Sequence, residues 1–266
     1  MPLAVCATPI GNLEDITLRV LAELREADVV LAEDTRHTRG LLERHGIQAR
    51  LLSYHEHNEA ARVAELLPRL EAGERIALVT DAGMPVVSDP GARLVRAALD
   101  AGVEVTVLPG PSAVETALVA SGLGGGSYAF VGFLPRKAGE LDALWRELGS
   151  WSGPAVAFES AQRLPATLRS LAAFDPAREV AVCRELTKRF EEVVRGRADE
   201  LAERFAAAPK GEITLVVAAA SGSSDPTAAR AAVAELVEAG TPRGVAAEVV
   251  SRLTDLSRND LYRGSL

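Results

Sequence analysis

Residues 33–38, Glu-Asp-Thr-Arg-His-Thr, concentrate ionisable side chains directly after the apolar residues 29–31. A carboxylate in this segment could orient a hydroxyl group or accept its proton, and His37 could titrate near neutral pH. Solvated residues at the entrance of a helix are an equally good interpretation of the pattern. The segment is therefore a candidate for acid–base chemistry and not yet a site.

A second cluster of charges, Arg184, Glu185 and Lys188, follows another apolar run. Lysine is scarce in this chain, which makes Lys188 the more interesting member. Its ammonium group could hold an anion or lower the pKa of a nearby hydroxyl group. Surface ion pairing, which is worth little energetically, is the alternative.

Two loops rich in glycine and proline each end an apolar run. Residues 80–91 (TDAGMPVVSDPG) follow the run 76–79, and residues 109–113 (PGPSA) follow the run 105–108. Ligands of open α/β sheets bind outside the carboxyl ends of the strands, and buried parallel strands have short apolar sequences. The two loops therefore predict the floor of a ligand site.

Strand-like and helix-like segments alternate through the first part of the chain, which predicts a mostly parallel, doubly wound α/β domain. Asp15 and Asn58 are expected to open helices, and Asp89, which precedes a proline, is expected to cap a third. Strands are expected at residues 3–7, 29–31, 76–79 and 105–108, and helices end near residue 46 and span about 91–101.

A second α/β domain is expected to begin near Pro111, before a glycine-rich loop and an aromatic strand. Its strands are expected at residues 128–133, 155–158, 179–183, 191–195 and 213–218, and its helices at about 139–148, 163–173 and 198–207. The composition of residues 220–226 is that of a flexible linker. The expected division is an N-terminal α/β domain at residues 1–110, a C-terminal α/β domain at 111–220, and a linker with a helical tail at 221–266.

The tail segment, residues 243–262, reads as helix, short turn and helix, with Ser257 as the cap of the second helix. Its pattern is similar to a helix-turn-helix, whose arginines could contact nucleic acid. Nearby acidic residues nearly cancel these arginines, so a plain packing hairpin is an equal alternative.

Composition limits the class of protein. The formal net charge is -8, which argues against a general, sequence-blind binder of nucleic acid. With two cysteines, neither a disulfide framework nor a zinc cluster is indicated, and His55 and His57 alone are weak support for a metal. We expect no metal, no membrane span and a cytoplasmic protein.

Several blocks of the chain, taken in order, resemble one family. They are residues 7–17 (ATPIGNLEDIT), 32–38 (AEDTRHT), 80–91, 108–113, 132–136 (GFLPR), 158–160 (FES), 183–188 (CRELTK) and 211–216 (GEITLV). The chain resembles the ribosomal small-subunit RNA methyltransferase I family, S-adenosylmethionine-dependent 2'-O-ribose methyltransferases within the tetrapyrrole methylase superfamily. The match is ordered and nearly full length.

The resemblance implies two α/β domains of the class III methyltransferase type, S-adenosylmethionine as cofactor in the cleft between them, and a homodimer. It also implies which residues bind the cofactor: Ile10, Gly11, Asp81, Ala82, Gly83, Ser112, Ala113, Phe158, Glu159, Leu186, Glu212, Ile213 and Thr214. Asp81 could accept a hydrogen bond from the ligand, or could be a local cap of its turn. Ser112 could cap a helix whose free amides face the ligand carboxylate.

The resemblance also implies an RNA acceptor, 16S rRNA in the small ribosomal subunit. The candidates for catalysis are then Asp34, Arg36, Glu159 and Lys188, with Arg36 or Lys188 on a phosphate and Asp34 or Glu159 as equal candidates for the proton acceptor.

Two departures from the family pattern matter. Residues 137–142 (KAGELD) stand where relatives usually have a longer, more basic segment, which puts RNA contacts there in doubt. Met84 replaces the usual threonine of the cofactor loop, and we expect the backbone contacts to survive this change.

The expected function is 2'-O-methylation of a cytidine in the decoding region of 16S rRNA. A tetrapyrrole C-methyltransferase of the same superfamily is one alternative, although it needs a roomy apolar trough and this chain has few aromatic residues. A non-catalytic nucleotide-binding or ribosome-assembly module is the other.

Overall fold

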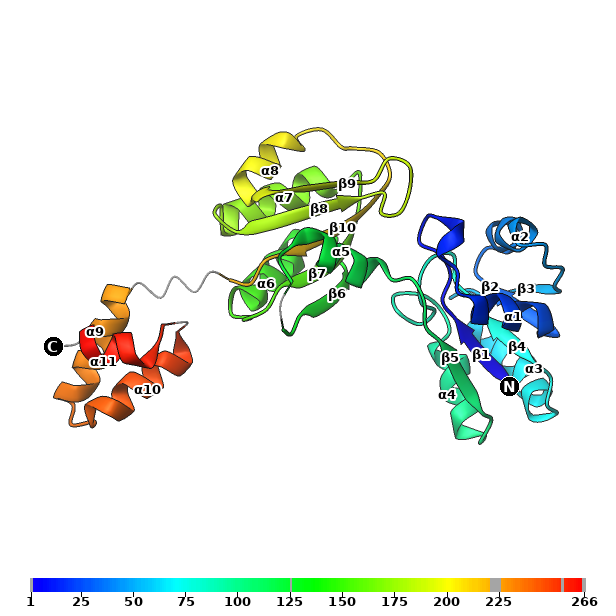
Figure 1. Cartoon of the computed structure of the whole chain (residues 1–266), viewed down its shortest axis with the longest axis horizontal. Coiled ribbons are helices and arrows are strands. Elements are labelled where there is room, and N and C mark those ends of the chain that lie inside the picture. Colours follow the sequence, from blue (N-terminus) through cyan, green and yellow to red (C-terminus); the bar gives the residue numbers. More distant parts are fainter. Residues whose placement is uncertain (1, 125, 221–225, 255, 265–266) are drawn as a thin grey trace. The chain divides into compact units, whose positions relative to one another are not determined.

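The computed structural model describes residues 2–124, 126–220, 226–254 and 256–264 (Figure 1). The chain divides into two compact units, Met1–Ala219 and Ala220–Leu266. The larger unit contains two five-stranded β-sheets, and the smaller unit is helical. The boundary expected between residues 110 and 111 falls inside the larger unit and stays a prediction.

The first sheet is entirely parallel, with the strand order β3-β2-β4-β1-β5. Helices α1 and α2 pack on one of its faces, and α3 and α4 pack on the other. This is the doubly wound layer order that the alternation of apolar segments predicts. The strands are β1 Leu3–Cys6, β2 Val29–Ala32, β3 Leu51–Ser53, β4 Ile76–Leu78 and β5 Val105–Leu108, and the helices are α1 Leu18–Glu26, α2 Thr35–Arg44, α3 Glu59–Glu71 and α4 Ala92–Asp100.

Two helix caps differ from the expectation. A short 3-10 helix, η1 Leu13–Asp15, precedes α1, and the Thr17 hydroxyl accepts the capping hydrogen bond from the Val20 amide at 3.2 Å. Asp15 therefore closes a turn instead of opening the helix. Helix α4 has Gly91 as its N-cap, so the expectation that Asp89 caps it was wrong. Asn58 does stand at the N-cap of α3.

Strand β3 was not predicted from the sequence. It has three residues, lies at the edge of the sheet and is only half-buried. A strand of this kind lacks the continuous apolar run that marks the central strands.

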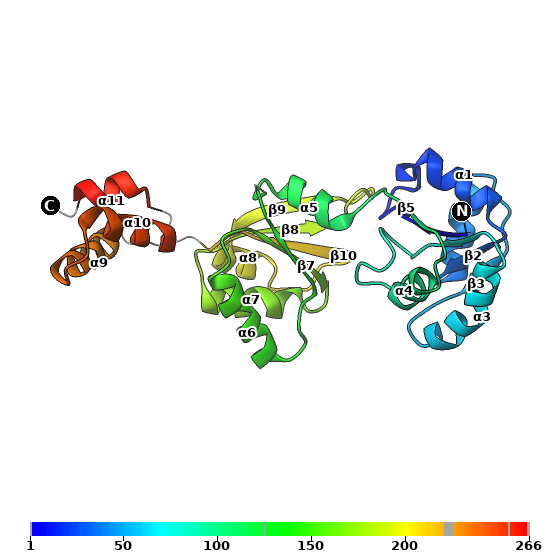
Figure 2. The ribbon, with the colours of Figure 1, turned by 90° about the horizontal axis from the view of Figure 1, so that it is seen from below.

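The second sheet is mixed, with the order β6-β7-β10-β8-β9, in which only β6 and β7 run parallel. Helix α5 packs on one face, and α6, α7 and α8 pack on the other (Figure 2). The strands are β6 Ala129–Phe133, β7 Ala155–Ser160, β8 Glu179–Arg184, β9 Glu192–Arg197 and β10 Glu212–Val217, and the helices are α5 Ala113–Ser121, α6 Ala138–Gly149, α7 Leu164–Phe174 and α8 Ala198–Arg204. The expected elements are confirmed to within a few residues at their ends.

The smaller unit consists of three helices around its own apolar core. They are α9 Pro226–Glu238, α10 Arg243–Leu253 and α11 Arg258–Gly264. The core residues include Val233 from α9, Val250 from α10 and Leu261 from α11. The Ser257 hydroxyl accepts from the Asp260 amide at 3.1 Å, as expected of a cap. Residues 221–225 of the expected linker lie outside the described residues.

No helix among the described residues is long and apolar enough to cross a membrane.

Candidate active site

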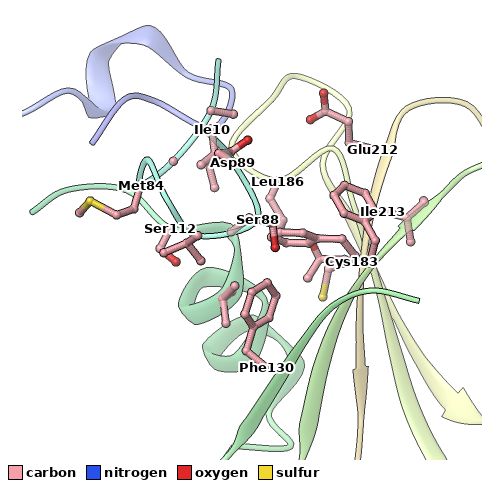
Figure 3. A pocket seen from close by; sticks show the side chains of 18 of the residues that line it. Ile10, Met84, Ser88, Asp89, Ser112, Phe130, Cys183, Leu186, Glu212 and Ile213 are labelled. Atoms are coloured by element: carbon pink, nitrogen blue, oxygen red, sulfur yellow. The ribbon is translucent and has the colours of Figure 1, made fainter. Parts of the chain in front are cut away.

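A cavity of about 830 Å³ lies within the larger unit (Figure 3). Loops at the carboxyl ends of the first sheet supply one side, as the position of the Gly/Pro-rich loops predicts. The second sheet supplies the other side through β6, β7, β10 and the loop after β8. The lining residues are Ile10, Glu33, residues 81–84, residues 87–89, Pro109, Gly110, residues 112–115, Tyr128, Phe130, Phe133, residues 158–161, Cys183, Leu186 and residues 211–214.

The loop after β4 is held in place by the loop after β1. The amides and carbonyls of Thr8 and Gly83 pair with each other at 2.8 and 3.1 Å, and the Thr8 hydroxyl donates to the carbonyl of Thr80 at 2.9 Å. Gly83 has a φ of 83°, a conformation that favours glycine. The backbone at this side of the cavity is therefore fixed before any ligand binds.

Strained backbone is concentrated in two loops that line the cavity. Among the described residues, Val86, Ser88, Glu185 and Thr187 are the non-glycine residues with positive φ, between 53° and 77°. A positive φ is especially unfavourable for a β-branched residue such as Val86. Strain of this kind persists where the surrounding structure enforces it, and it gathers at ligand sites.

Three carboxylates face the cavity from the first sheet: Glu33 after β2, and Asp81 and Asp89 in the loop after β4. The Thr80 hydroxyl donates to Glu33 at 3.2 Å. Burial, joined by the negative charges of Glu33 and Asp81 and opposed by a hydrogen bond from Thr80, raises the pKa of Asp89 to about 6. Asp89 can therefore exchange a proton in the neutral range, which an ordinary aspartate cannot.

Asp89 is positioned by a buried network beneath its loop. The Glu59 carboxylate accepts from the Gly91 amide at 2.7 Å and from the Tyr54 hydroxyl at 3.1 Å. Gly91 has a φ of 135°, which favours glycine, and a Cβ atom there would lie 2.8 Å from Cδ2 of Leu78. The segment that carries Asp89 is thereby fixed against the core of the first sheet.

Glu159 lines the cavity, and its carboxylate is held by neighbouring groups of the protein. Its carboxylate accepts from the Ser160 amide at 2.7 Å and the Thr167 hydroxyl at 2.6 Å, and it lies 3.3 Å from the Arg163 guanidinium. The side chain is fully buried. These contacts fit a group that shapes the turn after β7.

Asp34 lies outside the cavity lining and caps helix α2. Its carboxylate accepts from the Arg36 amide at 2.8 Å and from the Arg36 guanidinium at 2.7 and 3.1 Å. Hydrogen bonds from the Arg36 side chain and backbone hold the pKa of Asp34 well below its usual range. The Asp34 amide donates to Asp81 at 3.1 Å, which ties this turn to the cavity wall.

Lys188 also lies outside the cavity lining, and its ammonium group donates to Glu212 at 2.7 Å and to Glu185 at 3.1 Å. Burial disfavours the charge, but these two hydrogen bonds outweigh it and raise the pKa of Lys188. The side chain is therefore a permanent cation at neutral pH.

The helix start at residue 112 differs in detail from the expectation. Ser112 stands at the N-cap of α5, but its hydroxyl donates to Glu115 instead of accepting from the helix amides. Glu115 also accepts from the Tyr128 hydroxyl at 2.7 Å. The first amides of α5 are left without a side-chain cap at the edge of the cavity.

Most of the residues proposed to bind the cofactor line this one cavity. They are Ile10, Asp81, Ala82, Gly83, Ser112, Ala113, Phe158, Glu159, Leu186, Glu212, Ile213 and Thr214. Gly11 does not line it and instead contacts the loop after β8. Of the catalytic candidates, the structure brings Glu159 to the cavity, whereas Asp34, Arg36 and Lys188 stand outside it.

Of the aromatic wall of the cavity, the sequence predicted Phe158 but not Tyr128, Phe130 and Phe133. Phe158 lies edge-on to Phe130 and Phe133, at ring distances of 5.1 and 5.4 Å, and Tyr128 is beside them in the lining. The cluster of aromatic residues in one strand was visible as a signal. Side chains alternate between the two faces of a strand, so the sequence did not reveal which aromatic side chains point into the cavity.

The chain matches the family model of the tetrapyrrole (corrin/porphyrin) methylases over residues 2–202. Curated relatives are similar over most of the chain. A "Ribosomal RNA small subunit methyltransferase I" from Mesorhizobium japonicum is 43% identical over 98% of this chain and 90% of its own length. Relatives of the same name from Mycobacterium bovis and Thermotoga maritima are 48% and 46% identical, over 90% and 81% of this chain and 85% and 97% of their own lengths.

Solved structures share the fold at lower identity. A uroporphyrin-III C-methyltransferase from Thermus thermophilus, complexed with S-adenosyl homocysteine, superimposes with a TM-score of 0.57 at 20% identity, over 81% of this chain and 96% of its own. The methyltransferase CobJ superimposes with a TM-score of 0.63 at 18% identity, over 82% of this chain and 94% of its own.

Proposed function

Since the chain belongs to the ribosomal RNA small subunit methyltransferase I family of the tetrapyrrole methylases, we propose that it methylates the ribose 2'-oxygen of a cytidine in the decoding region of 16S rRNA. The methyl donor in this proposal is S-adenosylmethionine.

One observation carries the proposal: the identity of 43% to a curated relative spans almost the whole of both chains. Similarity limited to the methyltransferase fold would fit many acceptors, because one fold hosts many functions. The similarity to this relative extends beyond the residues that match the fold family, to almost the whole chain. It therefore supports the substrate that the relative's name gives, the RNA of the small ribosomal subunit.

The cavity fits the proposed methyl donor in size and in chemistry. Its volume of about 830 Å³ lies within the range of small-molecule sites. The donor supplies a methyl group on a cationic sulfonium, and Glu33, Asp81 and Asp89 give the cavity negative charge while the phenylalanine rings give it apolar surface. We expect backbone groups of residues 81–83, 112–113 and 212–214 to make the remaining polar contacts, with Ile10, Phe158 and Leu186 in apolar contact.

Asp89 is our proposed acceptor for the proton that leaves the ribose hydroxyl. Asp34 and Glu159 were the candidates from the sequence, but the carboxylates of both are occupied by hydrogen bonds within the protein. Asp89 faces the cavity, and its raised pKa makes it a better base than an ordinary aspartate.

The chain's main contribution to rate is alignment. Two fixed loops and a preformed aromatic wall can hold two reactants in line, and orientation can supply roughly 7–11 kcal/mol in favourable cases. The bound donor would supply the methyl group by breaking its methyl carbon–sulfur bond, with S-adenosylhomocysteine as the leaving group. Asp89 would take the proton that the 2'-hydroxyl loses.

We further propose that the protein acts in the cytoplasm, on the assembled small subunit, and as a homodimer. The names of the curated relatives support the small ribosomal subunit as the target, and the homodimer is an expectation from the family resemblance.

The test is a transfer assay with methyl-labelled S-adenosylmethionine and small subunits from a strain that lacks the modification. We expect label in the RNA at a single nucleotide, which nuclease digestion will locate. Label on a tetrapyrrole and not on RNA would favour the alternative activity of this superfamily. No transfer to any acceptor, with donor binding intact, would favour a non-catalytic module.

A further inference from the structure

A second hollow, of about 480 Å³, adjoins the cavity and has a different lining. We call it the outer hollow. It is lined by Gly11, Asn12, Leu13, Glu14, Arg44, Thr187, Lys188 and Arg189.

The cavity and the outer hollow share a wall. Ile10 and Leu186 line the cavity, and the residues that follow each of them, Gly11 and Thr187, line the outer hollow. The Asn12 amide donates to the Thr187 hydroxyl at 2.9 Å. The outer hollow is therefore next to the place where we propose that the methyl group is transferred.

Gly11 is required by the contact between the two loops of this wall. A Cβ atom there would lie 2.6 Å from Cγ of Lys188 and 2.8 Å from the carbonyl oxygen of Leu186. This close approach gives a physical reason for the glycine that differs from contact with the cofactor.

The loop after β8 is held in one conformation by hydrogen bonds. Glu185 and Thr187 both have positive φ, and each is held by hydrogen bonds: Glu185 accepts from the Glu212 amide at 3.0 Å, and the Thr187 amide donates to Glu191 at 2.6 Å. Arg189 and Phe190, which follow Lys188, are exposed residues at the end of this held segment.

Of the charged residues that line the outer hollow, Glu14 is acidic and Arg44, Lys188 and Arg189 are basic, but two of these cations are paired. Arg44 pairs with Glu14 at 2.5 Å, and Lys188 pairs with Glu185 and Glu212. Arg189 is exposed, and it has no carboxylate partner in the part of the chain that the structure describes. It is the cation in this hollow whose charge is free for an external anion.

Phe190, the residue after Arg189, is an apolar residue that is exposed to solvent. Its side chain is 66% exposed, and the Arg189 guanidinium lies 5.5 Å from the centre of its ring. An exposed aromatic ring beside an arginine is the combination that proteins use for single-stranded nucleic acid, with a base stacked on the ring and a phosphate on the cation.

We propose that the outer hollow holds the RNA strand next to the methylated nucleotide, with Arg189 on a backbone phosphate and Phe190 stacked against an unpaired base. The inference rests on the proposed function, because a polynucleotide whose ribose enters the cavity keeps its neighbours attached. Those neighbours must lie on the adjoining surface, and Arg189 and Phe190 offer them a cation and a stacking platform.

The test compares Arg189→Ala, Phe190→Ala and Phe190→Trp with the wild-type protein and with Arg146→Ala, a change of another exposed arginine, on α6 and away from both hollows. For each protein, the KM and kcat for small subunits, the salt dependence of KM, and the Kd for S-adenosylmethionine are measured. We expect Arg189→Ala and Phe190→Ala each to raise KM about tenfold, with the Kd for the donor unchanged.

Two details separate the proposed roles from general damage. Arg189→Ala loses one phosphate contact, so KM should depend less steeply on salt. Phe190→Trp keeps a stacking surface and should restore KM to near the wild-type value. Both alanine variants behaving like Arg146→Ala would overturn the inference, and so would failure of tryptophan to restore KM.

Failure of the proposed function is distinguishable from failure of this inference. Wild-type protein that transfers no label to RNA would contradict the function. Co-sedimentation of each protein with small subunits needs no transfer, and equal binding by wild type, Arg189→Ala and Phe190→Ala would overturn the inference independently.

Discussion

The cavity and the outer hollow lie side by side and differ in charge. The carboxylates of Glu33, Asp81 and Asp89 face the cavity without a cationic partner among the described residues. In the outer hollow, Arg44 and Lys188 are paired with carboxylates, and Arg189 is left as the free cation within the described ranges of the chain. A cationic methyl donor suits the first environment, and a phosphate of the proposed acceptor suits the unpaired Arg189 of the second. The net charge of -8 conceals this division. Local charge and not total charge is informative about the partners of this protein.

The largest effect is expected from removing the proposed base, Asp89, from the cavity. We expect Asp89→Asn to lower kcat about 100-fold, because the amide cannot accept the proton, while the Kd for S-adenosylmethionine changes little. In the wild type, the rate should rise with pH up to about 6 and then level off, as Asp89 loses its proton. The variant should lack this rise. A pH–rate profile of both proteins is the measurement, and full kcat in the variant would remove Asp89 from the mechanism.

A second change asks whether negative charge in the cavity attracts the donor. Asp81→Asn keeps an oxygen for the Asp34 amide but loses the charge, and we expect donor affinity to fall about tenfold, equivalent to 1.4 kcal/mol. Calorimetric titration measures this, with Asp100→Asn, an exposed change on α4, as the control. The thermal unfolding of the apo protein should barely move. Equal affinity of the two variants would mean that Asp81 does not contact the ligand.

A truncation tests whether acceptor binding extends beyond the outer hollow. Ending the chain at Ala219 removes a unit that has its own core, so the larger unit should stay folded. We expect unchanged donor affinity and a severalfold higher KM for small subunits. A matching loss of donor affinity would instead make the tail part of the structural core.

The smallest effect expected concerns stability. The pKa of Asp89 is raised to about 6, so between about pH 4 and pH 6 the folded protein holds a proton that the unfolded chain has released. Stability contributed by this group is therefore lost as pH rises through this window. At pH 7.5, we expect Asp89→Asn to be more stable by about 1 kcal/mol, or roughly 2–4 °C in Tm. At pH 4 the difference should vanish, and thermal unfolding at the two pH values checks this. An equal difference at both would point to a cause other than the charge.

The first sheet was predictable because its central strands are buried on both faces and appear as apolar runs. Strand β3, at the edge and half-buried, has no such run and was missed. The second sheet was predicted element by element, but its mixed strand order was not, because alternation along a strand does not reveal the direction of its neighbours.

The residues of the site that lie in the Gly/Pro-rich loops were predictable. The roles of residues that depend on tertiary contacts were not. The position of the loops after strands predicted the floor of the site. The family resemblance named Asp81 and Ser112 within those loops, and both line the cavity. Asp before Pro is common at helix starts and predicts a cap at Asp89, but Gly91 stands at the N-cap of α4. That Asp34 and Glu159 are occupied by internal partners depends on residues that fold against them, which no local pattern contains.

The most direct test of the proposed function is the chemical position of the methyl group. A 2'-O-methyl group blocks alkaline cleavage at its nucleotide, because the neighbouring hydroxyl can no longer attack the phosphodiester. We predict that small-subunit rRNA treated with this protein and S-adenosylmethionine gains one alkali-resistant linkage, at a cytidine of the decoding region. Methyl transfer to a base, with every linkage still cleaved by alkali, would contradict the assignment.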